Sequence, residues 1–188
     1  MHTIHLYHAS KTTGLAELFP RVSSHQTKYV YAIENPVTAL LFGAPKDDFD
    51  FLLDEEDGIP CVYECYHNAF ENIYKNQNCS LYEVDSAFFQ KGKTGWKPEW
   101  ISEQPVIVLN ETKIDNLYEE LQKAQSQNQL IIHKFLEQNS YKNMIAQHII
   151  DRLIRFDLLE KAEQDPRFQK QFRKLFEQLK ILLSGEYL

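Results

Sequence analysis

The chain has 188 residues, of which 43% are hydrophobic and 25% are charged, and this composition excludes a disordered protein. Its formal net charge of −7 opposes the phosphate backbone, so non-specific binding to nucleic acid is not expected as its main activity. The N-terminus lacks the basic start and apolar run of a signal peptide, and no stretch approaches the ~18 apolar residues of a membrane-spanning helix. We therefore expect a cytoplasmic protein without a membrane partner.

Strand patterns dominate the first part of the chain. They occur at residues 3–9, 28–33, 61–67, 79–89 and 99–109. Asn35 and Pro36 predict the start of a helix that ends near Gly43. The intervening segments 11–26 and 47–57 are predicted to be loops, and the third and fourth strands are candidates for a hairpin.

From Asp115 onward, the apolar residues change from a period of two to a period of 3.6. The predicted helices begin at residue 115, cover residues 129–138 and 141–161, and end with one that starts at Asp165-Pro166. We therefore predict an α+β fold with two domains. Residues 1–112 form a split, mostly antiparallel β core, and residues 113–188 form an all-helical C-terminal region packed on it. The side chains predicted to be buried are Leu6, Val30, Ala39, Phe42, Val62, Leu81, Val106 and Val108.

Three segments of the first domain form a pattern together. Residues 6–10 read LYHAS and are soon followed by Gly14-Leu15, residues 29–43 read YVYAIENPVTALLFG, and residues 99–103 read EWISE at the start of a late strand. In this order they resemble the ADP-ribosyltransferase superfamily, whose split β-fold binds NAD. The RNA 2′-phosphotransferases and the DNA-targeting ADP-ribosylating toxins share the same opening. The resemblance covers about the first 110 residues of the chain.

This resemblance implies a role for each residue type. His8, on the first strand, would form a hydrogen bond with the ribose hydroxyls of NAD, and Ser10 would assist from the same strand face. Tyr31, on the second strand, would stack on the nicotinamide, and Phe42 in the following helix is counted among the NAD-binding residues. A glutamate on the late strand would hold the ribose 2′-hydroxyl and stabilise the oxocarbenium-like centre as nicotinamide leaves.

Glu99 and Glu103 are the two candidates for this catalytic carboxylate. Residues four apart in a strand are separated by ~13 Å, so only one of them can meet the ribose. Glu99 is preferred, because the carboxylate in similar sequences comes at the start of the strand, before a Pro-Val pair such as Pro105-Val106. Each candidate also has an ordinary structural interpretation: a histidine packed in a strand, a ridge of aromatic side chains, or a solvated glutamate.

The sequence supports two classes of function. The first is an NAD-dependent ADP-ribosyltransferase-like enzyme that acts on an unknown acceptor, or an NAD glycohydrolase if water is the acceptor. The second is a non-catalytic interaction module that keeps the fold and docks a partner through its apolar last helix, which contains Phe168 and Phe172. Lys91, Lys93 and Lys97 are interpreted as a solvated loop in preference to a local nucleic-acid groove, which the net charge alone does not exclude.

Cys61, Cys65 and His67 raise the question of a metal site. In a strand, Cys61 and Cys65 are ~13 Å apart and cannot share a tetrahedral zinc ion. We therefore expect no metal at these residues and interpret the cysteines, including Cys79, as small buried hydrophobic side chains. Their odd number does not match the disulfide pattern of a secreted protein.

Overall fold

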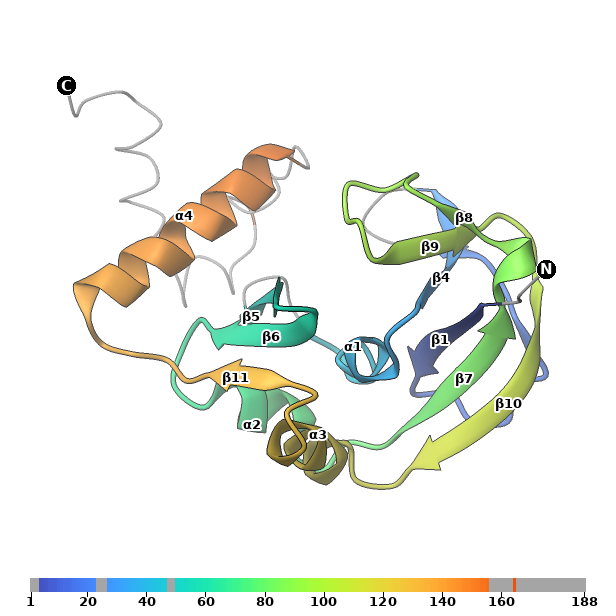
Figure 1. Cartoon of the computed structure of the whole chain (residues 1–188), viewed down its shortest axis with the longest axis horizontal. Coiled ribbons are helices and arrows are strands. Elements are labelled where there is room, and N and C mark those ends of the chain that lie inside the picture. The colour runs from blue at the N-terminus through green and yellow to red at the C-terminus, as the bar shows by residue number, and fades with distance from the viewer. Residues whose placement is uncertain (1–3, 23–26, 47–49, 156–163, 165–188) are drawn as a thin grey trace. The chain divides into compact units, whose positions relative to one another are not determined.

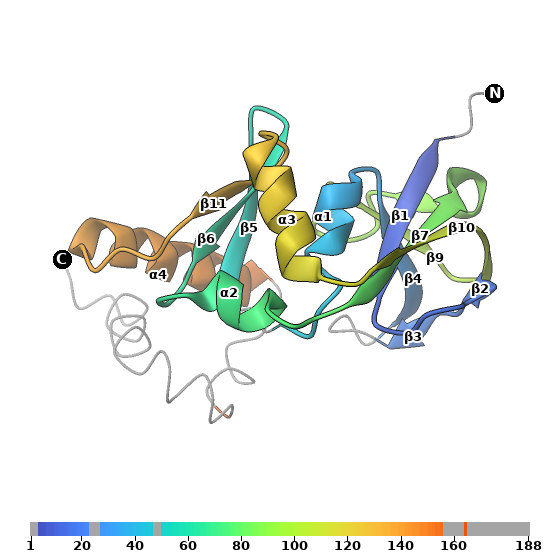
Figure 2. The ribbon, with the colours of Figure 1, turned by 90° about the horizontal axis from the view of Figure 1, so that it is seen from below.

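The computed structural model describes residues 4–22, 27–46, 50–155 and 164. Figures 1 and 2 show the helices and strands in two views at right angles. The chain divides into two compact units, and each unit is assembled from segments that are separate in the sequence. The first unit comprises Met1–Lys46, Glu55–Cys61 and Phe70–Ile131, and the second comprises Asp47–Asp54, Val62–Ala69 and Ile132–Leu188.

An eight-stranded sheet forms the framework of the first unit (Figure 1). The strands are β1 (His5–Ser10), β2 (Glu17–Leu18), β3 (Arg21–Val22), β4 (Lys28–Ile33), β7 (Cys79–Asp85), β8 (Gln90–Lys91), β9 (Glu99–Ser102) and β10 (Val106–Ile114). Their order is β2-β10-β7-β1-β4-β9-β8, with β3 paired to β4, and each of these pairings is antiparallel. The first strand therefore lies in the middle of the sheet, between β7 and β4.

One face of this sheet carries a hydrophobic cluster of the first unit. The buried residues of this cluster are Leu6, Leu18, Val30, Ala32, Tyr82, Val84, Phe89 and Val106. Successive side chains of a strand point to opposite faces, and directly paired residues share a face, so the pair Leu6↔Val84 fixes which residues of β1 and β7 lie here. We call this side of the sheet the core face.

Helix α1 (Pro36–Leu40) follows β4 and packs against β1, β4 and β7. Asn35 caps its N-terminus, because the side-chain oxygen accepts hydrogen bonds from the N–H groups of Val37 at 2.9 Å and Thr38 at 3.1 Å. The proline at the first helical position has no N–H that needs a partner. Ala39 is buried by the packing of this helix.

Two further helices, α2 (Ala69–Tyr74) and α3 (Leu117–Ser126), flank β7 and β10 in the sequence. The hydroxyl of Tyr74 is buried and donates a hydrogen bond to the main-chain oxygen of Leu41 at 2.7 Å. Helix α3 is capped by Asn116, whose side chain accepts a hydrogen bond from the N–H of Glu119. The Tyr74 bond ties the end of α2 to the residue after α1, and the Asn116 cap stabilises the start of α3.

Three shorter strands form a second sheet in the order β11-β6-β5. They are β5 (Phe51–Glu56), β6 (Ile59–Glu64) and β11 (Ile131–His133). Asp57 and Gly58, between β5 and β6, both have positive φ angles, of 49° and 80°. Two such residues form the tight turn that joins adjacent antiparallel strands with the correct twist.

The second unit has its own hydrophobic cluster, built on α4 (Asn139–Arg155). Ile145, Ile149 and Leu153 follow one another at intervals of four and form a buried stripe on the helix. Leu52, Cys65 and Tyr141 complete the buried cluster. Glu64 is only 1% exposed, and its carboxylate accepts hydrogen bonds from Lys134 Nζ at 3.2 Å and from the N–H of Phe135 at 3.1 Å.

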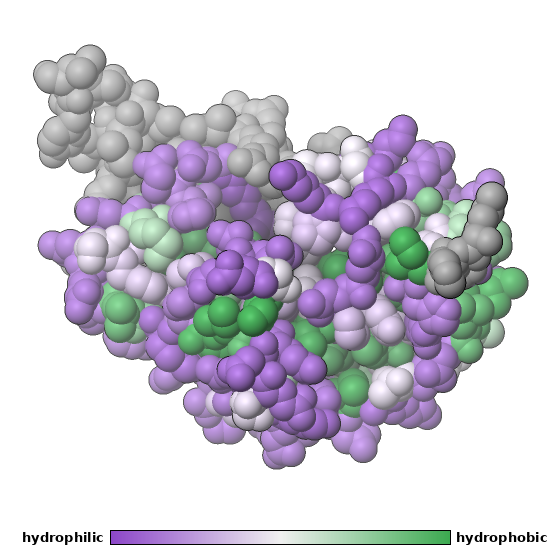
Figure 3. Space-filling view, in the orientation of Figure 1, coloured by the Kyte–Doolittle hydropathy of each residue, from purple (hydrophilic) through white to green (hydrophobic). Residues whose placement is uncertain are grey.

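In the described ranges, no helix combines the length and the hydrophobicity needed to span a bilayer. Hydrophilic residues cover most of the face shown in Figure 3, with smaller hydrophobic areas between them. Phe19, Val22, Ile107 and Leu109 are among the large hydrophobic side chains that remain exposed. Exposed side chains of this kind are normal on globular proteins.

The structure confirms the α+β class and the mainly antiparallel sheet. Each of the five predicted strand segments contains a strand, but residues 99–109 hold two, β9 and β10. The chain turns between them because the Ser102 hydroxyl donates to the Gln104 oxygen at 3.0 Å and accepts from the Gln104 N–H at 3.2 Å. Pro105 then has no N–H to contribute to a strand ladder.

The prediction of an all-helical C-terminal region is wrong, because β11 lies where a helix was expected at residues 129–138. Asn128 ends α3 by adopting a left-handed φ of 56°, and the N–H of Gln129 bonds to the Ala124 oxygen at 2.9 Å. The β-branched residues Ile131 and Ile132 then favour a strand. The last predicted helix lies outside the described residues.

Three other expectations also need correction. The segment 47–57, predicted to be a loop, contains β5, and the loop at 11–26 contains the short strands β2 and β3. The predicted hairpin does not form, because β6 and β7 belong to different sheets. Phe42 is 41% exposed, because α1 ends at Leu40 and Phe42 is not in its helical register. Leu6, Val30, Ala39, Val62 and Val106 are buried as expected, and Leu81 and Val108 are half-buried.

Candidate functional site

The pairing of β1 with β4 has the single register pair Tyr7↔Ile33. Because the two strands are antiparallel, the residues of β1 after Tyr7, up to Ser10, run alongside the residues of β4 that precede Ile33. On its other edge β1 pairs with β7 along its whole length, from His5 to Ser10. Residues 8–10 of β1 and 28–32 of β4 form no register pairs with each other, although both ranges pair with other strands. We call these two ranges the open end of the β1–β4 pair.

His8 is the first residue of β1 in the open end. Its Nδ1 lies 2.7 Å from the main-chain oxygen of Tyr31, and because a carbonyl only accepts, Nδ1 carries the hydrogen. Burial lowers the pKa of His8 from its ordinary value, the bond to Tyr31 raises it, and nearby Arg21 lowers it. The ring is therefore neutral at about pH 7, and its unprotonated Nε2 can accept a hydrogen bond from a ligand hydroxyl.

Ser10 shares the core face with His8, since the two residues are separated by two positions in one strand. On the neighbouring strand, Tyr82 is directly opposite His8 and Ser80 is directly opposite Ser10. The Ser10 hydroxyl oxygen accepts a hydrogen bond from the N–H of Thr12 at 3.2 Å. The structure therefore brings His8 and Ser10 together on one face, as expected from the sequence.

The side chains of Tyr31 and Glu99 lie on the opposite face of the sheet. Alternation along β4 separates Tyr31 from Val30 and Ala32, which belong to the core face. Its ring contacts that of Tyr29 edge to face, with centroids 5.8 Å apart. Tyr31 therefore meets His8 through its main-chain oxygen, and alternation directs its ring elsewhere.

Phe42 lies just beyond α1, where the helical hydrogen bonds end. Its ring centroid is 5.7 Å from that of Trp96, and the ammonium group of Lys46 lies 4.6 Å from the Phe42 centroid. With 41% of its surface exposed, Phe42 presents a flat aromatic surface to solvent. No hydrogen bond or ring contact among the described residues joins it to His8.

Glu99 is the first residue of β9, and Glu103 directly follows its last residue, Ser102. Glu99 is paired with Ile33, the residue that also closes the β1–β4 pair. Ser102 is paired with Val30, inside the open end, and Glu103 follows it as an exposed residue on the connection to β10. Glu103 is therefore the glutamate on the open-end side.

A group of polar residues near His8 was missed from the sequence. Ser80 and Tyr82 on β7 are fully buried with their hydroxyls on the core face, and Glu111 on β10 is paired with Tyr82. Glu111 Oε1 lies 2.6 Å from the Ser80 hydroxyl and 2.8 Å from the N–H of Gly14. Ser80 and Tyr82 are two hydroxyl-bearing residues on the same face of β7 as Val84, and this was the signal that could have revealed the group.

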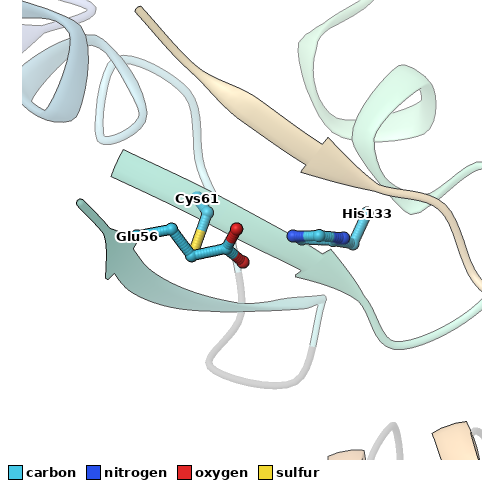
Figure 4. A group of neighbouring side chains, drawn as sticks. All are labelled: Glu56, Cys61 and His133. Atoms are coloured by element: carbon cyan, nitrogen blue, oxygen red, sulfur yellow. The ribbon is translucent and has the colours of Figure 1, made fainter. Parts of the chain in front are cut away.

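Cys61, Cys65 and Cys79 are buried, and none of them forms a disulfide with a described residue. Glu56, Cys61 and His133 each offer one ligand atom, and these atoms lie within 4.8 Å of one another (Figure 4). Three ligand atoms within this bound do not by themselves define the four-coordinate geometry of a structural zinc site, so we assign no metal to the group. The absence of zinc at Cys61, Cys65 and His67 stays a prediction. Burial raises the pKa of the Cys65 thiol to about 12.

No family model, no curated protein and no solved structure matches the chain at a significant level.

Proposed function

We propose that the first unit is an ADP-ribosyltransferase-like domain that uses NAD as co-substrate and transfers ADP-ribose to an unknown acceptor or to water. The resemblance of residues 6–43 to that superfamily supports the proposal, as does the mainly antiparallel sheet with His8 on a central strand. The observation that carries it is the hydrogen bond from His8 Nδ1 to the Tyr31 oxygen, which leaves a neutral imidazole in the open end whose Nε2 has no hydrogen-bond partner among the described residues.

The proposed chemistry uses each of these groups. His8 Nε2 accepts a hydrogen bond from a ribose hydroxyl, and the Ser10 hydroxyl lies on the same face to assist. The bond between the nicotinamide nitrogen and ribose C1′ breaks, and nicotinamide leaves with the bonding electrons. The acceptor forms a new bond to C1′ and releases its proton to the carboxylate or to solvent. The carboxylate stabilises the positive charge that develops on the ribose.

Among the glutamates, the register of β9 favours Glu103 over Glu99 for this role. Glu103 follows Ser102, whose partner Val30 lies in the open end, whereas Glu99 is paired with Ile33 where β1 and β4 meet. Glu103 is also exposed and can approach a ligand without leaving a buried partner. The proposed site therefore combines His8, Ser10 and Glu103.

Titration calorimetry with NAD tests the binding role of His8. We expect His8→Ala to weaken NAD binding by about fivefold, which corresponds to one hydrogen bond of about 1 kcal/mol. His5→Ala is the matched control, because His5 lies on the same strand but on the opposite face, where it bonds to Glu83. Equal losses in the two variants would contradict the proposal that His8 contacts the ribose.

An NAD glycohydrolase assay tests the carboxylate. We expect Glu103→Gln to lower kcat by about 100-fold and leave the NAD dissociation constant nearly unchanged, because an amide cannot stabilise the developing cation as a carboxylate does. Glu99→Gln is the control and should retain activity. If the loss occurs in Glu99→Gln instead, the choice of glutamate is wrong. If the wild-type protein neither binds nor cleaves NAD, the enzyme proposal fails and the chain is better described as an interaction module.

A further inference from the structure

We infer that Glu111 is a positioning residue of this site, which holds the loop of residues 11–16 in the conformation that NAD binding requires. The inference rests on the proposed function. The loop leaves β1 directly after His8 and Ser10 and leads to β2. Glu111 lies on β10, two strands away from β1 in the sheet, and acts on the site through this loop.

One oxygen of the Glu111 carboxylate fixes the tip of the loop. Oε1 accepts a hydrogen bond from the N–H of Gly14 at 2.8 Å and from the Ser80 hydroxyl at 2.6 Å. Gly14 has a φ of +72°, a left-handed conformation that glycine adopts without strain. The pKa of Glu111 is lowered from its ordinary value, mainly by the hydrogen bond from the Ser80 hydroxyl and next by the one from the Gly14 N–H. The group is therefore a carboxylate at neutral pH.

Tyr82 holds the loop at two further points. Its hydroxyl donates to the main-chain oxygen of Thr12 at 2.7 Å and accepts from the N–H of Leu15 at 3.2 Å, and it also lies 3.3 Å from Glu111 Oε1. Tyr82 is fully buried, so these partners replace water that the hydroxyl would otherwise have. Thr12, Gly14 and Leu15 are thus each bonded to a side chain of the sheet.

The register of the sheet explains why this clamp reaches the proposed site. Tyr82 is directly opposite His8 on one side and directly opposite Glu111 on the other. The three residues therefore form one row across the core face, with His8 and Glu111 about 10 Å apart in the backbone. The N–H of Thr12 also bonds to the Ser10 hydroxyl, so the conformation of the loop determines how that hydroxyl is oriented.

The other carboxylate oxygen of Glu111 makes no hydrogen bond to any described residue. A chemical role would need the negative charge, whereas the clamp needs only an acceptor oxygen at the position of Oε1. The conservative substitution Glu111→Gln keeps such an oxygen and removes the charge. This difference separates the two roles.

The test combines amide hydrogen exchange with NAD binding and hydrolysis. We expect Glu111→Ala to speed exchange of the Gly14 and Leu15 amides, to raise the dissociation constant and KM for NAD about fivefold or more, and to leave kcat within about twofold. Glu111→Gln should restore all these values to within about twofold of wild type. Asn110→Ala is the matched control, because Asn110 is exposed on the same strand and faces the other way.

Other results of these experiments would overturn the positioning role of Glu111. Unchanged exchange in Glu111→Ala overturns the clamp, and faster exchange with unchanged NAD affinity overturns its role in the site. Loss of kcat in Glu111→Gln at unchanged KM overturns positioning in favour of a chemical role. If Glu111→Ala does not fold, Ser80→Ala removes one of the two short bonds and must show smaller changes in the same direction. Wild-type protein that does not bind NAD refutes the proposed function and the role of the clamp in it, although exchange would still report the clamp itself.

Discussion

The environment of His8 makes its protonation unfavourable. The residue is half-buried, and desolvation by burial is the main cause of its lowered pKa in the folded protein. Below about pH 6.5 the unfolded chain therefore binds this proton more readily than the folded one, and stability is lost as the pH falls through the folded pKa. We expect the free energy of unfolding to fall less from about pH 7 to about pH 5 in His8→Gln than in wild type, measured by urea denaturation. Identical losses would show that His8 does not contribute to the pH dependence.

Gly43 lies where the chain passes closely over β7. A Cβ atom at this position would be 2.7 Å from the Cys79 sulfur and 3.1 Å from the Leu40 oxygen. Cys79 is only 2% exposed and has little room to move. We expect Gly43→Ala to lower the free energy of unfolding by about 1–3 kcal/mol. The cost should be smaller in a Cys79→Ala background, because the sulfur is gone, and a double-mutant cycle that gives additive values would contradict this explanation.

Among the helices and strands, the short helix α1 depends on its N-cap, Asn35, for stability. The helix has only five residues, so the two hydrogen bonds that Asn35 accepts are a large part of its local stabilisation. We expect Asn35→Ala to cost about 1 kcal/mol in the free energy of unfolding, and Asn35→Asp to cost much less, because aspartate also caps. Chemical denaturation of the three proteins measures this. An equal loss in both variants would show that the cap is not responsible.

Local sequence signals predicted the elements that depend on neighbouring residues. Asn35-Pro36 marked the start of α1 correctly, and alternation identified β1 and β4 and the shared face of His8 and Ser10. The Asp57-Gly58 pair could have revealed the turn between β5 and β6, because this dipeptide favours the tight turns of hairpins. The acidic residues around it were instead interpreted as a surface loop.

The clamp on β10 could not be predicted from alternation. The register shifts between Val108 and Asn110, where the strand has a bulge. Counting by two from Val106 and Val108 would assign Asn110 to the core face and Glu111 to the other. The extra residue reverses this order, so that Glu111 pairs with Tyr82 on the core face. A bulge of this kind depends on the partner strand and has no local signature here.

On the scale of the whole molecule, each unit contains its own hydrophobic cluster. His8, Ser10, Glu103 and Glu111 all belong to the first unit. The net charge of −7 opposes a phosphate-bearing ligand, so NAD binding has to depend on local groups. Arg21, on β3 opposite Tyr29, is a cation close enough to His8 to lower its pKa. The proposed site therefore needs only segments of the first unit.

Binding of NAD to such a site should stabilise the chain unevenly. A ligand present at about 100 times its dissociation constant raises the free energy of unfolding by about 2.7 kcal/mol. Because the proposed contacts come from β1 and the segment after β9, we expect hydrogen exchange to slow most in these segments when NAD is added. Helix α4 belongs to the second unit and should show the smaller change. Exchange mass spectrometry of wild type and His8→Ala at one NAD concentration measures this, and the variant should show less protection. Slowing in α4 as strong as in β1 would contradict a site built from the first unit alone.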